Sequence, residues 1–168
     1  MLLTFGPPEL APFLGKWIRD EISASRKVAN LTFGKETLKK LYACGSYAQL
    51  QRCLAEDPEL AEKYKRRLDA SGGESSFIVG PREITSDRAS PDGVNRTTRY
   101  PVLGLHKEGR TTVVTSTYRG GPMGLELRMR KEWLLVSERY FGRAATLFPR
   151  SPVFRYYRAP NARTKETT

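Results

Sequence analysis

The fold prediction starts from residues 99–136, RYPVLGLHKEGRTTVVTSTYRGGPMGLELRMRKEWLLV, where strand formers alternate with glycine turns. The β-branched pair Val113–Val114 favours extended backbone, and glycines precede it at turn positions. Residues 120–122, Gly-Gly-Pro, then reverse the chain into a run of alternating side chains. The apolar ones are Leu125, Leu127 and Met129, and the charged ones are Glu126, Arg128 and Arg130. A period of two predicts a half-buried antiparallel strand over residues 125–136.

The first seventy residues have helical spacing instead. Leu14, Trp17, Ile18 and Ile22 recur at the helical period and predict a first helix over residues 14–22. Three further helices are predicted, over residues 35–44, 47–55 and 58–68. Ser46 begins a capping box, and Asp57 is an N-cap followed by a proline at the first helical position.

The change from helical to alternating periodicity at residues 71–73 sets the predicted fold class. Short strands are expected at 77–79, 83–85, 94–102, 111–118 and 125–136. Helices followed by an antiparallel sheet are typical of the α+β class. We therefore expect an N-terminal helical segment, a small twisted antiparallel sheet packed on a helix, and an extended basic C-terminal arm. The corresponding domains are 1–56, 57–138 and 139–168.

The positive charge is concentrated at the C-terminal end. The chain of 168 residues has a formal charge of +11, and residues 139–168 carry seven basic side chains and one acidic one. Aromatic residues are interleaved with the arginines, whereas disordered tails are poor in aromatics. Arginine and aromatic side chains also dominate interface energetics. The predicted partner-binding residues are Arg143, Arg150, Arg155, Tyr156 and Tyr157.

Several short motifs resemble one mitochondrial family. They are Tyr-Pro-Val-x-Gly-x-x-x-x-Gly at residues 100–109, Arg-Gly-Gly-Pro at 119–122 and a strand closing on Trp133. Ile-Val-Gly-Pro at 78–81 stands where the family has a turn after a helix. Together these motifs, over residues 57–137, are similar to the family of cytochrome oxidase assembly factor 1 and the Tim twenty-one subunit of the presequence translocase.

The resemblance implies a place at the mitochondrial inner membrane, in respiratory-chain assembly or presequence import. No apolar run approaches the roughly 20 residues that cross a bilayer. We therefore expect an accessory subunit or assembly partner of a large complex, associated with the inner membrane without a transmembrane helix of its own. The expected partners are the other subunits of that complex.

The sequence shows no catalytic constellation, so the predicted protein is not an enzyme. The single histidine, His106, lies in a predicted turn among charged residues and is expected to be a solvated polar group. Cys44 and Cys53 flank the turn between two predicted helices and could approach each other, but free buried thiols are favoured. Two cysteines without histidines are short of a zinc site. No cofactor, metal or small-molecule substrate is expected.

The basic arm also supports a second function class. Arginine pairs with phosphates and aromatic rings stack on bases, so the arm is also consistent with binding to RNA or anionic lipid. The alternative is an RNA-contacting structural subunit of the mitochondrial ribosome.

Overall fold

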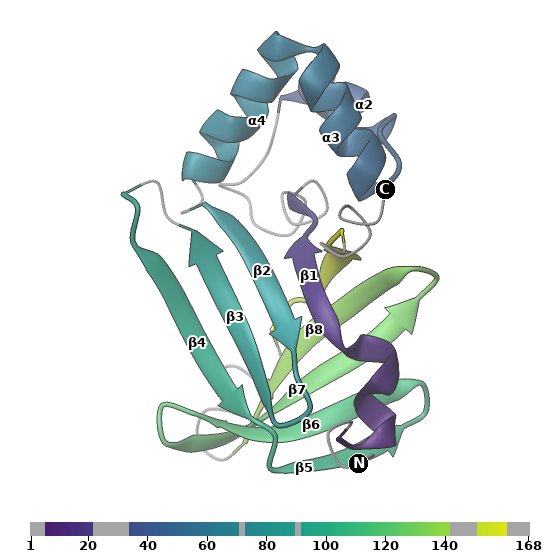
Figure 1. Cartoon of the computed structure of the whole chain (residues 1–168), viewed down its shortest axis with the longest axis vertical. Coiled ribbons are helices and arrows are strands. Elements are labelled where there is room, and N and C mark those ends of the chain that lie inside the picture. Colours follow the sequence, from purple (N-terminus) through teal and green to yellow (C-terminus); the bar gives the residue numbers. More distant parts are fainter. Residues whose placement is uncertain (1–5, 22–33, 71–72, 90–91, 142–150, 161–168) are drawn as a thin grey trace, which may run out of the picture.

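The computed structural model describes residues 6–21, 34–70, 73–89, 92–141 and 151–160. Within them, one nine-stranded antiparallel sheet is accompanied by three α-helices and a 3-10 helix (Figure 1). In chain order the elements are η2 (Pro8–Phe13), β1 (Gly15–Arg19), α2 (Lys35–Tyr42), α3 (Tyr47–Glu56), α4 (Pro58–Ala70), β2 (Glu74–Val79), β3 (Glu83–Ala89), β4 (Asn95–Pro101), β5 (Gly104–Glu108), β6 (Thr111–Tyr118), β7 (Gly121–Arg130), β8 (Trp133–Tyr140) and β9 (Phe154–Arg158).

The strands form a nearly complete ring. Their order in the sheet is β4-β3-β2-β1-β9-β8-β7-β6-β5, so successive strands are neighbours and the last one, β9, returns to pair with β1. The ring is interrupted between β4 and β5 in the described structure. Across that gap the rings of Tyr100 and Tyr118 lie 6.0 Å apart. Large twisted sheets curl in this way, and this one curls into an open barrel (Figure 1).

The α+β prediction is wrong. Residues 14–22, predicted as the first helix, contain strand β1, and the predicted C-terminal arm contains β9 at the centre of the sheet. Strands from the predicted segments 1–56, 57–138 and 139–168 all build the same sheet. The helices are an insertion between β1 and β2, not an N-terminal layer beneath a small sheet.

Burial on both faces explains why β1 and β9 were missed. Successive residues Trp17 and Ile18 are both buried, as are Tyr156 and Tyr157. A strand covered on both faces loses the apolar-polar alternation that marks a half-buried strand. In β1 the remaining apolar spacing then matches the helical period by coincidence.

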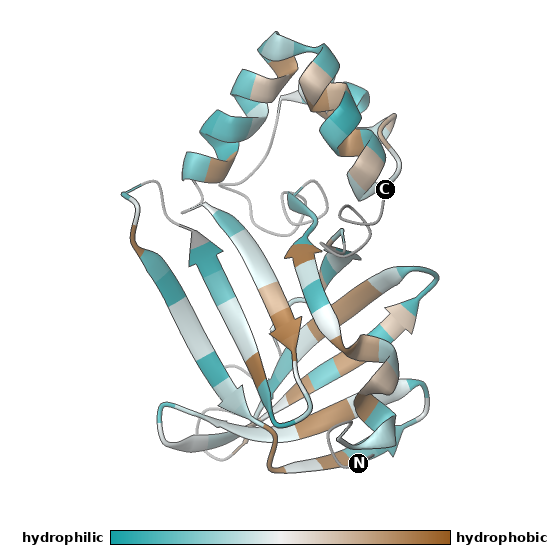
Figure 2. Ribbon diagram, in the orientation of Figure 1, coloured by the Kyte–Doolittle hydropathy of each residue, from teal (hydrophilic) through white to brown (hydrophobic). Residues whose placement is uncertain are grey.

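The main core lies on the inner face of the curled sheet, with η2 packed against it. Figure 2 shows β3 becoming more hydrophilic toward the end that faces the helices. The buried residues of this core are Leu10, Phe13, Trp17, Phe77, Val79, Ile84, Tyr100, Val114, Met123, Leu125, Leu127, Leu134, Val136 and Tyr156. These side chains come from η2 and from every described strand except β5, so the core joins distant parts of the chain.

Trp17 ties the N-terminal segment to the last strand. Its indole Nε1–H donates a hydrogen bond of 2.8 Å to Phe13 O. The Arg158 guanidinium lies over the indole at 4.1 Å and donates to Leu14 O at 3.0 Å and Pro12 O at 3.1 Å. This arrangement fixes β9 beside the segment that precedes β1.

The helices α2, α3 and α4, called the helical unit below, confirm the three helix predictions for this region. Ser46 Oγ accepts from the Gln49 amide at 3.2 Å, and Gln49 Oε1 accepts from the Gly45 amide at 2.9 Å. Asp57 Oδ1 accepts from the Leu60 amide at 3.1 Å. These bonds satisfy amides that the first turn of a helix leaves unpaired.

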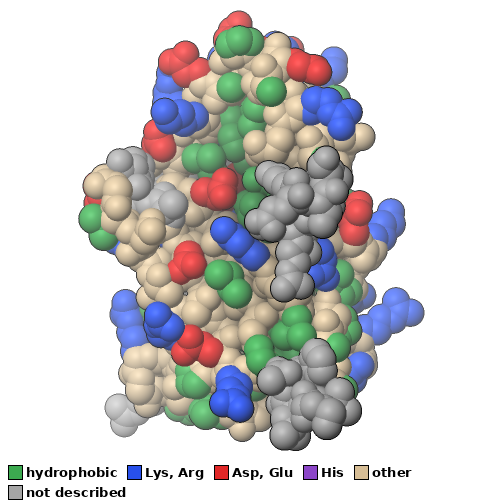
Figure 3. All heavy atoms as spheres, in the orientation of Figure 1, with side chains coloured by type: hydrophobic (Ala, Val, Ile, Leu, Met, Phe, Trp, Pro, Cys, Tyr) green, Lys and Arg blue, Asp and Glu red, His purple; other side chains and the backbone are tan. Residues whose placement is uncertain are grey.

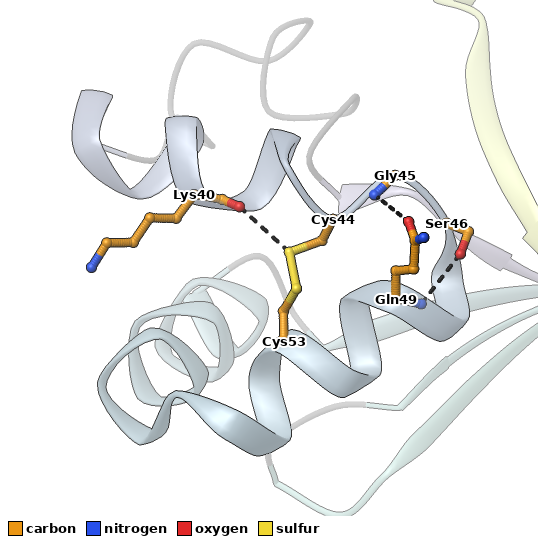
Figure 4. The surroundings of a disulfide bond; sticks show 6 residues. All are labelled: Lys40, Cys44, Gly45, Ser46, Gln49 and Cys53. Atoms are coloured by element: carbon orange, nitrogen blue, oxygen red, sulfur yellow. Dashed lines mark hydrogen bonds between the residues drawn. A yellow bond between two sulfur atoms is a disulfide. The ribbon is translucent and has the colours of Figure 1, made fainter.

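A disulfide joins Cys44, just after α2, to Cys53 in α3 (Figure 4). The preference for free thiols was wrong, because the chain reverses tightly enough to bring the two Cα atoms within 6.6 Å. The helical unit has a small core of its own, separate from that of the sheet. Its buried members are Leu41, Cys44, Leu50, Leu60 and Tyr64.

Four of the predicted strands overlap β2, β3, β4 and β6, but β5 lies where a turn was predicted, and the predicted strand 125–136 is two strands. The chain turns between Arg130 and Trp133, where Lys131 has a φ of 57°. The predicted alternation within β7 is correct, since Leu125 and Leu127 are buried and Arg128 is exposed. Local alternation identified the face of the strand but not its end.

Candidate ligand-binding cleft

Strand β9 carries three of the five residues predicted to bind a partner. Tyr156 points to the inner core and is 8% exposed, and Tyr157 points outward and is 5% exposed. Arg155 is only partly exposed. Arg143 and Arg150 lie outside the described residues. Tyr156 and Tyr157 are therefore buried in the sheet, and Arg155 lies partly exposed in the same strand.

Arg155 is held within the sheet by two neighbours. Its Nε donates a hydrogen bond of 2.8 Å to Oδ2 of Asp20, a carboxylate that is 1% exposed. Its guanidinium also lies 3.9 Å from the ring centroid of Trp133. A guanidinium stacked on an indole and paired with a buried carboxylate is a structural anchor.

A cleft of about 520 Å³ lies beside β9, between the start of α3 and the turn that joins β7 to β8. Its lining residues are Ser46, Tyr47, Ala48, Met129, Glu132, Trp133, Tyr157 and Arg158. Residues from three separate parts of the chain therefore meet at one site. We call it the cleft from here on.

Three aromatic rings form much of the wall. Trp133 and Tyr157 are directly paired across β8 and β9. The rings of Tyr157 and Tyr47 lie 5.9 Å apart at an interplanar angle of 40°. The thioether of Met129 adds an adaptable apolar surface. These side chains offer flat apolar contact area at low conformational cost.

Local structure explains how these rings are positioned. The Ser46 cap begins α3, so Tyr47 stands in its first turn. The left-handed residue Lys131 closes the β7–β8 turn, so Trp133 is the first residue of β8. Each ring is thus held next to an element end rather than in the middle of a flexible loop.

The charges around the cleft are unequal. Arg158 is exposed and donates to backbone carbonyls, which carry no net charge. Arg130 is exposed and lies directly opposite Trp133 in the β7–β8 pairing. Glu132 is the carboxylate among the lining residues. Two guanidinium groups against one carboxylate favour a negatively charged group on a ligand.

Burial keeps the tyrosines of the cleft neutral. Burial raises the pKa of Tyr47, and a nearby charge on Glu74 raises it further. Burial likewise raises the pKa of Tyr157, with the Asp20 carboxylate adding to the effect. A phenol is protonated at neutral pH even in water, so these raised pKa values extend the neutral form to higher pH, and both side chains contribute rings and neutral hydroxyls.

Two polar clusters elsewhere have structural explanations. On the inner face, the Tyr100 and Tyr140 hydroxyls both donate to the carboxylate of Glu138. On the outer face, Arg139 donates to both oxygens of Glu108, at 2.8 and 2.9 Å, and lowers the pKa of that carboxyl to about 2. The described residues contain no group of three or more metal-binding side chains.

His106, the one histidine of the sequence, is exposed as expected but has a partner. Its Nε2 lies 2.7 Å from Oε2 of Glu108. It stands in strand β5, not in a turn. The contact joins it to the outer-face cluster and leaves it away from the residues that line the cleft.

Sequence analysis selected Tyr157, but as a partner-binding residue of the arm, and did not select Tyr47, Met129, Trp133 or Arg158. Their positions in the sequence give little signal, because the cleft forms only when α3 approaches the sheet. Figure 3 shows Lys and Arg side chains scattered among Asp and Glu over the face drawn there, rather than gathered in one patch. Charge alone therefore does not identify the site.

Comparisons with known proteins give a distant structural likeness. No family model matches the chain, and no curated protein matches it. The crystal structure of the fluorescent protein UnaG shares 13% identity, covers 89% of this chain and 99% of its own, and has a TM-score of 0.37. A mutant of UnaG shares 12% identity, covers 89% of this chain and 98% of its own, and has a TM-score of 0.38. Likeness at this level assigns neither family nor function.

The prediction that the protein takes no small-molecule substrate is wrong. It rested on the absence of catalytic and zinc-binding motifs, which does not bear on a cleft lined by aromatic rings. The cleft has the volume of a ligand site. The partner prediction also relied on a basic arm, part of which is β9 in the sheet.

Other predictions are untouched by these findings. The resemblance to the mitochondrial family, and membership of an inner-membrane complex or a mitochondrial ribosome, stay predictions. Among the helices of the described residues, none has the length and apolar character to cross a membrane.

Raised tyrosine pKa values predict a loss of stability at high pH. Burial raises the pKa of Tyr156 to about 12, and burial is also the largest cause of the raised pKa values of Tyr64, Tyr100, Tyr140 and Tyr157. The fold favours the neutral phenol, so this contribution is complete below about pH 10, the unfolded pKa, and is lost as pH rises through the folded pKa. For Tyr156 the shift corresponds to about 3 kcal/mol.

The measurement is urea unfolding as a function of pH, followed by circular dichroism beside the ultraviolet absorbance of tyrosinate. The free energy of unfolding should fall steadily above about pH 10, and tyrosinate should appear together with unfolding. A free energy that stays constant while all eight tyrosines ionise would show that they are not buried in solution.

Proposed function

We propose that the protein is a non-enzymatic binding protein that holds a small organic molecule in the cleft. The observation that carries this proposal is the cleft itself: about 520 Å³, walled by Tyr47, Trp133 and Tyr157. Ligand sites in proteins are typically about 300–1,000 Å³, mostly apolar or aromatic, with a few polar groups that fix orientation. The cleft has this size and this composition.

The shape of the wall favours a ligand with a flat apolar part. Aromatic pairs contribute about 0.5–1.5 kcal/mol beyond the burial of their area. Three rings from different elements can contact one planar molecule on more than one side. The Trp133 indole N–H is also buried without a hydrogen-bond partner among the described residues, which makes an acceptor on the ligand favourable here.

The charge around the cleft favours an acidic ligand. Arg158 and Arg130 lie at the cleft and beside it, with Glu132 as the opposing carboxylate. A carboxylate or sulfonate on the ligand would gain from the guanidinium groups without displacing an existing ion pair, because Arg158 donates to carbonyls. The proposed ligand class is therefore a planar aromatic anion.

Binding rather than catalysis is proposed because the cleft lacks paired acid and base groups. Glu132 is the carboxylate of the lining, and neither a histidine nor a cysteine is among the lining residues. General acid–base chemistry requires a group positioned within hydrogen-bond reach of the reacting proton. The residues present supply contact area and charge.

The proposal predicts that an aromatic anionic probe binds at the cleft and that Tyr47→Ala weakens the binding. Titration with anilinonaphthalene sulfonate should give a saturable rise in probe fluorescence with one site. Loss of one stacking ring should raise Kd by about tenfold, which corresponds to about 1.4 kcal/mol. Trp133→Leu should have an effect of similar or larger size.

The matched control is Leu103→Ala. Leu103 is 62% exposed and lies between β4 and β5, away from the lining residues, so its loss should leave Kd unchanged. Circular dichroism of each variant checks that the sheet is folded. Equal affinities in the wild type, the cleft variants and the control would place the probe elsewhere and remove the proposal.

A further inference from the structure

The disulfide lies next to one wall of the cleft. Cys44 is followed by Gly45 and by Ser46, and residues 46–48 line the cleft. The bond to Cys53 clamps this turn against the second turn of α3 (Figure 4). The position of Tyr47, one of the three wall rings, therefore depends on a segment that the disulfide encloses.

Apart from the cap hydrogen bonds between Gly45, Ser46 and Gln49, the helical unit has little to hold that turn. Its core is a cluster of five buried residues separate from the core of the sheet, and Cys44 is one of the five. A core of this size gives limited stability, and small units usually need a covalent link. Among the described residues, the contact between the rings of Tyr47 and Tyr157 links α3 to the sheet.

We propose that the disulfide Cys44–Cys53 is a redox control of the cleft: the oxidised protein binds ligand, and reduction releases the cleft wall and weakens binding. This inference rests on the proposed binding function. The linked segment is short, so breaking the bond frees the turn at Gly45–Ser46 while the sheet keeps its own core. Reduction then displaces the Tyr47 wall of the cleft and leaves Trp133 and Tyr157 in place.

The chemistry requires a dithiol reductant. Its thiolate attacks Sγ of Cys53, which is less buried than Cys44, and the Cys44 thiolate leaves. The second thiol of the reductant then attacks the mixed disulfide, so two electrons pass to the protein and the reductant becomes a disulfide. Both cysteines end as thiols after protonation.

The reduced form has a defined local partner. Cys44 Sγ lies 3.4 Å from Lys40 O (Figure 4). A disulfide sulfur has no proton to donate, so this is a packing contact in the oxidised protein. After reduction the thiol can donate to that carbonyl as a weak hydrogen bond, which holds Cys44 on α2 and away from Cys53.

The experiment compares oxidised protein, protein treated with dithiothreitol, and the double variant Cys44→Ser with Cys53→Ser. The chain contains two cysteines, so the reductant acts on no other thiol pair. Affinity for anilinonaphthalene sulfonate is measured in each state, and amide hydrogen exchange is measured in parallel. Reduction should raise Kd by about tenfold or more, the effect of losing the Tyr47 ring. The double variant should have the same Kd as the reduced protein, and the reductant should not change that Kd.

Amide hydrogen exchange measures the effect of the disulfide on the cleft wall without a ligand. Amides of residues 46–50 should exchange about tenfold faster or more after reduction, while those of β7 and β8 stay protected, because the sheet has its own core. Equal probe affinity in both redox states overturns the redox control and leaves the binding function standing. If the probe binds in neither state, the binding function fails, and unchanged exchange at residues 46–50 then overturns the control as well.

Discussion

A chain cut after residue 150 is expected not to fold. The cut removes β9, which pairs with β1 on one side and β8 on the other. Because β9 lies at the centre of the sheet order, its loss leaves two separate four-stranded pieces. It also removes Tyr156 from the core and Arg155 from the buried carboxylate of Asp20.

The expected cost is comparable to the whole stability of an ordinary domain. Burial of one aromatic side chain contributes up to about 3 kcal/mol, and leaving a buried charge unpaired costs about 3–5 kcal/mol. Whole domains are stable by about 5–15 kcal/mol. Thermal melting followed by circular dichroism should therefore show no cooperative transition in the truncated chain.

The matched control is a chain cut after Pro160, which keeps every described strand. It should melt as the full chain does. A chain cut after residue 150 that melts cooperatively at the same temperature would contradict the position of β9 and support a dispensable arm instead.

The second large effect is expected from Trp17→Ala. Trp17 is fully buried, and replacing a buried tryptophan by alanine costs about 3–5 kcal/mol. The change also leaves Phe13 O without its indole donor and removes the ring beneath the Arg158 guanidinium. Urea unfolding should show a loss near the upper end of that range, enough to unfold a marginal protein.

Trp133→Ala is the comparison for this change. Trp133 is only partly buried and lies at the cleft, so its loss should cost about 1–2 kcal/mol through the Arg155 contact. Equal losses of stability in the two variants would mean that Trp17 does not occupy the core position described above.

Short-range sequence signals located the elements whose structure depends on neighbouring residues. Helices α2, α3 and α4 were predicted from the caps at Ser46 and Asp57, which act within one turn. Strands β2, β3, β4, β6 and β7 were located from alternation and turn residues, whereas β5 was missed. These elements need no information about distant parts of the chain.

The fold class failed because the two strands that close the ring depend on long-range contacts. Arg155 reads as a solvated cation in sequence, yet it pairs with Asp20, which lies 135 residues away. Trp17 and Ile18 are both buried, so β1 has no alternation to detect. Without β1 and β9, the remaining pattern reduces to helices followed by strands.

The cleft was missed for a related reason. Tyr47 and Trp133 belong to elements far apart in the sequence and meet at the cleft only through the folded arrangement of α3, β8 and β9. Tyr157 was selected as an anchor on a partner surface, and the structure places it in the wall of the cleft.

The most direct measurement uses the two tryptophans as reporters. The sequence contains two, so an amide correlation spectrum of labelled protein shows two indole N–H signals, which single substitutions assign to Trp17 and Trp133. Trp133 lines the cleft, and Trp17 is fully buried in the core. Titration with anilinonaphthalene sulfonate should shift the Trp133 signal in a saturable way and leave the Trp17 signal in place. A probe that binds without moving the Trp133 signal would contradict the cleft as the binding site.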